Sequence, residues 1–91
     1  MWKSISQVLA DQFGAYYSIK EKKKVHSGEM NEAWIINDGI QAVFVKVNER
    51  SYRSMFRAEA DQLILLNKTE SIRVPQVYGV GCSQNHSFIL M

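Results

Sequence analysis

Two charged residues interrupt apolar patterns in this sequence, and they are the first candidates for chemistry. Lys46 lies within residues 43–47, a run that is otherwise apolar. Glu59 follows Phe56 by three residues and precedes Leu63 by four, a spacing that places all three side chains on one face of a helix. Either charge alone would be costly to bury, whereas an ammonium and a carboxylate that meet can offset each other. The sequence therefore predicts an ion pair between Lys46 and Glu59.

A second interpretation of the same two residues stays open at this point. Lys46 can instead protect an exposed edge strand, and Glu59 can tilt into water. The remaining reactive side chains form no catalytic or metal-binding pattern, because His26 and His86 are far apart and Cys82 is the only cysteine. We expect Cys82 to be a buried, unreactive thiol, and we expect no metal site in this chain.

The elements that must position Lys46 and Glu59 follow from hydrophobic periodicity. Apolar residues at helical spacing predict a helix over residues 2–13, ended by Gly14. A tight turn is expected at residues 37–39, because Asp-Gly supplies backbone positions with positive φ. Strands are expected over residues 16–25, 33–36 and 40–47.

The second half of the chain predicts one more helix and two more strands. The helix covers residues 52–68, with Ser51 as its N-cap. Pro75 marks the following connection, and strands are expected over residues 76–81 and 87–91. The expected fold is α+β: one domain over residues 1–91, with an extra N-terminal helix and a five-stranded antiparallel sheet whose third and fourth strands are joined by the Glu59 helix.

Composition excludes several classes of protein. The chain has 91 residues, 46% of them hydrophobic, and a formal net charge of +2, so the total charge indicates no nucleic-acid partner. The charged run at residues 20–24 is better explained as a solvated edge strand than as a nucleic-acid patch. The single cysteine excludes an internal disulfide, and the longest apolar run, residues 63–66, is far too short to span a membrane. We expect a cytoplasmic, soluble protein.

Three segments resemble the fructosamine (ketosamine) kinase family. Phe44-Val45-Lys46-Val47 resembles its lysine strand, Ala58-Glu59-Ala60-Asp61-Gln62-Leu63 its glutamate helix, and Val74-Pro75-Gln76-Val77-Tyr78-Gly79-Val80-Gly81 its fourth strand. Residues 28–34 are similar to its first turn, and residues 1–13 to the opening helix of bacterial members. The resemblance covers all 91 residues of this chain, which correspond to only about the first third of a family member.

The resemblance implies the ATP-binding lobe of a protein-kinase-like fold and ATP-dependent phosphorylation of a sugar hydroxyl on a ketosamine. Lys46 would hold the α- and β-phosphates, and Glu59 would fix its ammonium. Gly28 and Asn31 would bring backbone amides to phosphate, although Gly28 can also be an ordinary hairpin glycine. Phe44 stands where protein kinases have a small residue over adenine, and Met91 stands where the fifth strand enters the adenine-binding hinge.

The resemblance also places the catalytic aspartate, the Mg²⁺ ligands and most of the sugar site in a C-terminal lobe that this chain lacks. We therefore expect no catalytic residue here, no turnover by the chain alone, and self-association or contact with that lobe through an uncovered apolar face. Two alternatives remain: a non-catalytic interaction module or remnant, and the lobe of a kinase related to aminoglycoside or choline kinases.

Overall fold

The structure, a computed structural model, describes residues 1–28, 31–69 and 73–91 and has the α+β architecture that the sequence predicts. Its sheet has five strands in the order β1-β2-β3-β5-β4, and every pair of neighbours is antiparallel. The elements in chain order are α1 (Trp2–Phe13), β1 (Glu21–Ser27), β2 (Glu32–Asn37), β3 (Ala42–Glu49), the 3₁₀ turn η1 (Arg50–Tyr52), α2 (Arg53–Thr69), β4 (Gly79–Cys82) and β5 (His86–Leu90).

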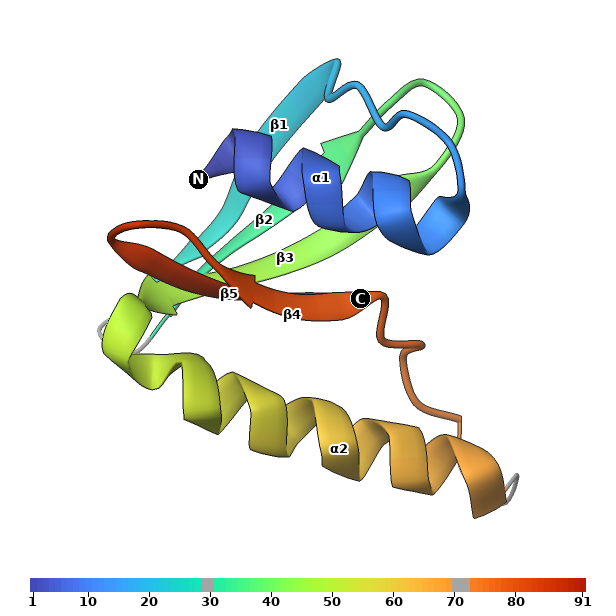
Figure 1. Cartoon of the computed structure of the whole chain (residues 1–91), viewed down its shortest axis with the longest axis vertical. Coiled ribbons are helices and arrows are strands. Elements are labelled where there is room, and N and C mark those ends of the chain that lie inside the picture. The colour runs from blue at the N-terminus through green and yellow to red at the C-terminus, as the bar shows by residue number, and fades with distance from the viewer. Residues whose placement is uncertain (29–30, 70–72) are drawn as a thin grey trace.

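The two helices cover opposite faces of the sheet, which runs between them in Figure 1. Alternation along β5 shows this directly, because Phe88 and Leu90 pack with α1 while Ile89 packs with α2. The α1 side holds the larger core, made of Ile5, Leu9, Tyr17, Ile36, Val43, Val45, Val47, Phe88 and Leu90. The α2 side holds a small core of Phe56, Ala60 and Ile89.

Helix α1 has the bounds that the apolar spacing predicts. Ile5 and Leu9 are fully buried one turn apart, so one stripe of the helix lies on the sheet. The helix ends at Gly14, whose φ of 70° is left-handed and whose amide donates to the carbonyl of Ala10. A glycine adopts this conformation without the steric cost that other residues meet.

Strand β1 begins at Glu21, so the expected strand over residues 16–25 starts five residues too early. Tyr17 explains the difference, because its ring is buried in the α1 core and its hydroxyl donates to the carbonyl of Gln41 at 2.7 Å. This contact holds Tyr17 in the core, and hydrogen bonding to β2 begins only at Lys20, whose amide donates to the Asn37 carbonyl at 2.8 Å. Burial, assisted by the nearby Asp38 charge, raises the pKa of Tyr17 to about 12.

The β2–β3 turn is also longer than predicted, since β3 begins at Ala42 and not at residue 40. The Asp38 carboxylate accepts hydrogen bonds from the amides of Gln41 and Ile40, and Gly39 has a φ of 96°. These bonds, that from Gln41 foremost, lower the pKa of Asp38. Ile40 is consequently 94% exposed, outside the strand.

Three further boundaries differ from the prediction. Ser51 lies inside η1 and is therefore not the N-cap of α2, so that prediction was wrong. The fourth strand is shorter than residues 76–81, and the fifth is displaced by one residue from 87–91. The Asn67 side chain donates to the carbonyl of Pro75, which ties residues before β4 to α2 instead of to the sheet.

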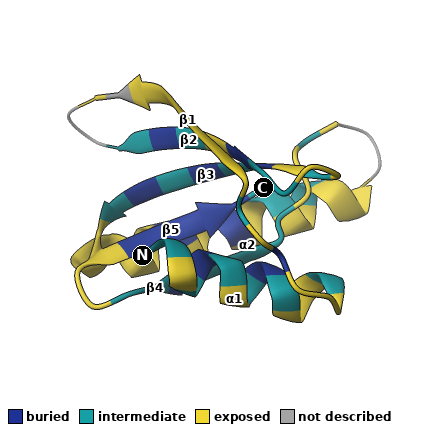
Figure 2. Cartoon of the chain, turned by 90° about the horizontal axis from the view of Figure 1, so that it is seen from above, coloured by how far each residue is buried: buried dark blue, intermediate teal, exposed yellow. Residues whose placement is uncertain are grey.

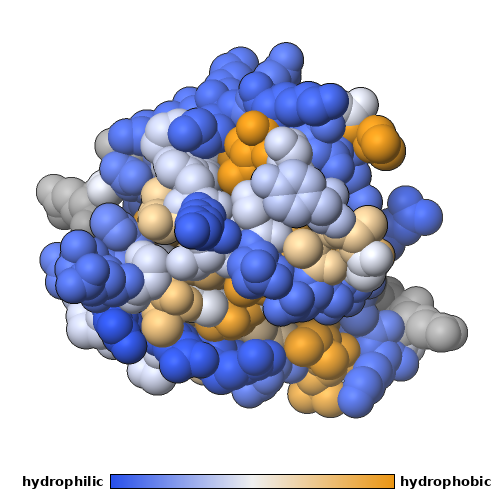
Figure 3. All heavy atoms as spheres, turned by 45° about the horizontal axis from the view of Figure 1, so that its top comes forward, coloured by the Kyte–Doolittle hydropathy of each residue, from blue (hydrophilic) through white to orange (hydrophobic). Residues whose placement is uncertain are grey.

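Burial is uneven across the sheet, as Figure 2 shows: β5 is buried along most of its length, whereas β1 is exposed. The face in Figure 3 is mainly hydrophilic, with hydrophobic atoms in separate small areas. Among the described residues, no helix combines the length and the apolar character needed to cross a membrane.

Candidate functional site

Lys46 and Glu59 form the ion pair that the sequence predicts. The Lys46 Nζ lies 2.8 Å from Glu59 Oε2 and 3.1 Å from Oε1, so the ammonium contacts both carboxylate oxygens. The two side chains are 30% and 33% exposed, which leaves the pair accessible from one side. The alternative of an edge-strand lysine is wrong, because β3 lies between β2 and β5.

The chain brings these residues together through its local geometry. Lys46 pairs across the sheet with Ile89, and its side chain is on the α2 face. The single turn η1 leads from β3 directly into α2, so that the helix returns over the same strand. Phe56 and Ala60 anchor the helix on Ile89. This anchoring turns Glu59, between them in sequence, toward Lys46.

The ion pair forms the polar end of a cleft of about 450 Å³. Phe44 lies two residues before Lys46 in β3 and therefore on the same face of the sheet. The other lining residues are apolar, and the full set is Phe44, Lys46, Glu59, Leu63, Pro75 and Met91. A cleft with one charged end and apolar walls suits a ligand that is itself anionic at one end and flat and apolar at the other.

Met91 reaches this cleft because its backbone is fixed to β3. Its amide donates to the Phe44 carbonyl at 2.9 Å, and its carbonyl accepts from the Phe44 amide at 2.8 Å. Both backbone groups of Met91 are thus engaged within the sheet. Its side chain can wall the cleft, and its amide has no hydrogen left to donate to a ligand, while its carbonyl oxygen retains a second lone pair.

Gly28 and Asn31 lie apart from the Lys46 cleft. They line a separate hollow of about 200 Å³ together with Asn48 and His86. The Gly28 amide donates to the Asn31 carbonyl at 3.1 Å, so this amide is engaged within the turn. The predicted contribution of residues 29 and 30 to the turn lies outside the described residues.

The sequence prediction did not include Pro75 as a wall of the cleft, because it placed this residue in the connection before the fourth strand. The proline itself carried the signal, since it ends regular structure and fixes the local backbone. A second missed feature lies near β2: Glu32 accepts from Lys24 at 3.2 Å and from the Trp34 indole at 3.4 Å. The hydrogen bond from Lys24 is the main reason that the pKa of Glu32 is lowered.

Comparison with known proteins identifies the group to which this chain is similar. A protein from Pasteurella multocida named a probable ketoamine kinase is 72% identical over 91 residues, and one from Vibrio parahaemolyticus is 43% identical. Each match covers 100% of this chain and 32% of the relative, so the chain spans about a third of the length of these curated relatives. A crystal structure of a protein provisionally named a fructosamine-3-kinase, from Haemophilus somnus 129PT, matches 99% of this chain and 30% of its own, with a TM-score of 0.96 and 77% identity.

The sequence model of one family, described as "Fructosamine kinase", matches residues 1–91 and therefore covers the same segments on which the resemblance rests. The match includes Lys46, Glu59 and all the residues that line their cleft. This chain belongs to the fructosamine kinase family.

Proposed function

We propose that this chain is the nucleotide-binding lobe of an ATP-dependent kinase that phosphorylates a sugar hydroxyl of a ketosamine. The ion pair of Lys46 with Glu59 at the end of an apolar-walled cleft is the observation that carries the proposal. The names of the related proteins support the same reaction class. Catalytic residues belong, in this proposal, to the part of the protein beyond these 91 residues.

Each residue of the cleft has a role in the proposal that follows from its chemistry. The Lys46 ammonium binds the α- and β-phosphates, and Glu59 holds that ammonium and directs it into the cleft. Phe44 and the Met91 side chain contact the flat adenine ring. Because the Met91 amide is engaged with Phe44, a hydrogen bond donated to the adenine edge comes from residues after Met91.

Mg²⁺ accompanies ATP in the proposed reaction and neutralises the charge that develops on its phosphates. In residues 1–28, 31–69 and 73–91, no group of three or more His, Cys, Asp or Glu side chains is placed to hold a metal ion. We assign the protein ligands of the metal to the other lobe, as we do the ketosamine site. Gly28 and Asn31 remain proposed phosphate-binding residues, at a hollow separate from the Lys46 cleft.

Replacing Lys46 by methionine tests the nucleotide site. We expect ATP affinity, measured by calorimetry, to fall about tenfold or more, because hydrogen bonds to charged groups contribute roughly 1.5–3 kcal/mol. Lys68→Met is the matched control, since Lys68 is exposed near the end of α2 and contributes nothing to the cleft lining. Equal ATP affinity in the two variants would contradict the proposed role of Lys46 and would favour a non-catalytic interaction module.

We also propose that the isolated 91-residue chain self-associates through the α2 face of its sheet. Ile35 pairs with Phe44 across the strands, is exposed, and extends the apolar surface of the cleft. Light scattering over a concentration series should show mass increasing with concentration. Ile35→Lys should suppress this association, whereas Ile40→Lys, at the exposed β2–β3 turn, should not. A monomer at all concentrations would refute the proposal.

A further inference from the structure

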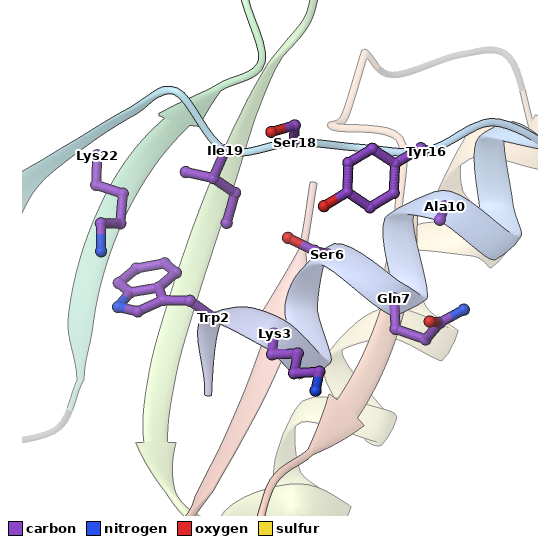
Figure 4. A pocket seen from close by; sticks show the side chains of 9 residues that line it. All are labelled: Trp2, Lys3, Ser6, Gln7, Ala10, Tyr16, Ser18, Ile19 and Lys22. Atoms are coloured by element: carbon purple, nitrogen blue, oxygen red, sulfur yellow. The ribbon is translucent and has the colours of Figure 1, made fainter.

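A second hollow, of about 520 Å³, lies on the side of the sheet opposite to the Lys46 cleft. It is bounded by α1 on one side and by the segment that leads into β1 on the other (Figure 4). We call it the α1 groove. Its volume is within the range of small-molecule sites, and none of its lining residues has a role in the nucleotide site proposed above.

The α1 groove carries positive charge that nothing nearby neutralises. Lys3 and Lys22 both line it, and none of its other lining residues is acidic. Within the described part of the chain, neither ammonium forms a salt bridge, whereas Lys24 pairs with Glu32 and Lys46 pairs with Glu59. An anion entering the groove would therefore meet two cations that are not already engaged with a carboxylate.

The groove also presents aromatic surface in a fixed position. The Lys22 ammonium lies 4.8 Å from the centre of the Trp2 ring, so charge and ring are adjacent. The Trp2 ring is held by Trp34, which contacts it edge to face with ring centres 5.0 Å apart and planes at 80°. Tyr16 is 84% exposed at the rim, an unusual exposure for a large aromatic side chain.

Hydroxyl groups complete the lining. In Figure 4 the Tyr16 hydroxyl and the Ser6 hydroxyl point toward the space between α1 and the adjacent segment. Neither hydroxyl has a hydrogen-bond partner among residues 1–28, 31–69 and 73–91, so each is available to a ligand. The groove thus combines cations, aromatic rings and free hydroxyl donors within one concave surface.

We propose that the α1 groove binds a small organic anion, with a flat apolar body beside Trp2 and Tyr16 and a phosphate or carboxylate group on Lys22. Lys3 extends from α1 on the other side of Trp2 (Figure 4) and adds positive charge to the groove without sharing that group. The proposal is independent of the nucleotide site, because it uses the opposite face of the sheet. An acidic ligand without a flat body would lose the aromatic contacts, and a neutral flat one would lose the two ammonium groups.

Tryptophan fluorescence provides a specific test, because Trp2 lines this groove and Trp34, the other tryptophan of the chain, contacts the Trp2 ring. Neither tryptophan lines the Lys46 cleft. Titration of the chain with phenyl phosphate should give a saturable change with a dissociation constant of about 1 mM or below. Inorganic phosphate supplies the anionic group without the ring, and benzyl alcohol supplies the ring without the charge. Each should bind at least about tenfold more weakly than phenyl phosphate. The absence of saturable binding by phenyl phosphate would overturn the proposal.

Variants separate the groove from other anion sites. Lys22→Gln should weaken phenyl phosphate binding about fivefold or more. Lys3→Gln should weaken it while leaving the contact of Lys22 with Trp2 intact, so a change in ring position cannot explain the loss. Lys68→Gln, an exposed lysine of α2, should leave binding unchanged.

Competition with ATP tests whether phenyl phosphate binds at the α1 groove or at the Lys46 cleft. Saturating ATP with Mg²⁺ should not displace phenyl phosphate from the groove, because the proposed nucleotide cleft lies on the opposite face. Displacement by ATP, or equal weakening by Lys68→Gln, would show that the signal arises from another site or from general charge attraction, and would overturn the assignment.

Discussion

The 91-residue chain, mixed with ATP, Mg²⁺ and a fructosyl-amine, is expected to transfer no phosphate above background. The cleft explains this expectation, since Glu59 is the only carboxylate among the described residues that line it and is already engaged by Lys46 through both oxygens. A general base must accept the proton of the attacking hydroxyl, and the remaining lining residues Phe44, Leu63, Pro75 and Met91 are apolar. Phosphate transfer to the fructosyl-amine, followed by mass spectrometry, measures the outcome.

The result is informative only together with ATP binding by the same preparation. ATP bound without transfer would support a nucleotide-binding lobe that depends on other residues for chemistry. Transfer that is present in the parent chain and lost in Lys46→Met would contradict our assignment of the catalytic groups to another lobe. Transfer that persists in Lys46→Met would instead indicate a contaminating enzyme.

Replacing Leu9 by alanine is expected to destabilise the chain by about 2–5 kcal/mol, because the substitution leaves a cavity in the core between α1 and the sheet. Leu65→Ala is the matched control: it makes the same change within a helix at a position that is 64% exposed, and should cost about 0.5 kcal/mol or less. Urea unfolding measures both. Similar midpoints would show that α1 is not a required part of the fold.

The helix α1 and the strand that contains Lys46 were predictable because each depends on residues close in sequence. Gly14 directly follows the apolar residues that form the helix, so its end can be recognised from the local sequence. Lys46 stands within an apolar run, so the interruption can be recognised in the same way. The start of β1 was not predictable, because it depends on Tyr17 reaching Gln41, 24 residues away. The Ser51 cap failed for a related reason, since a serine signal does not distinguish a 3₁₀ turn from the helix that follows.

The Lys46 cleft could be anticipated, whereas the α1 groove could not. Lys46 and Glu59 each violate a local apolar pattern, so their pairing follows from the cost of burying charge. Trp2 fits its helix as an ordinary core aromatic, and only the folded chain brings Lys22 over its ring. The contact joins two elements whose residues show no irregular spacing, and the sequence offers no signal for it.

The uneven burial of the sheet sets how readily its peptide groups meet solvent. Residues 87–90 of β5 are buried, so their amides should exchange with deuterated water only when most of the fold opens. Residues 21–26 of β1 are exposed, and their amides should exchange through local separation from β2. Strand β1, which leads to Gly28, therefore opens at low free-energy cost, while Met91 at the cleft wall is joined to the part of the sheet that opens last.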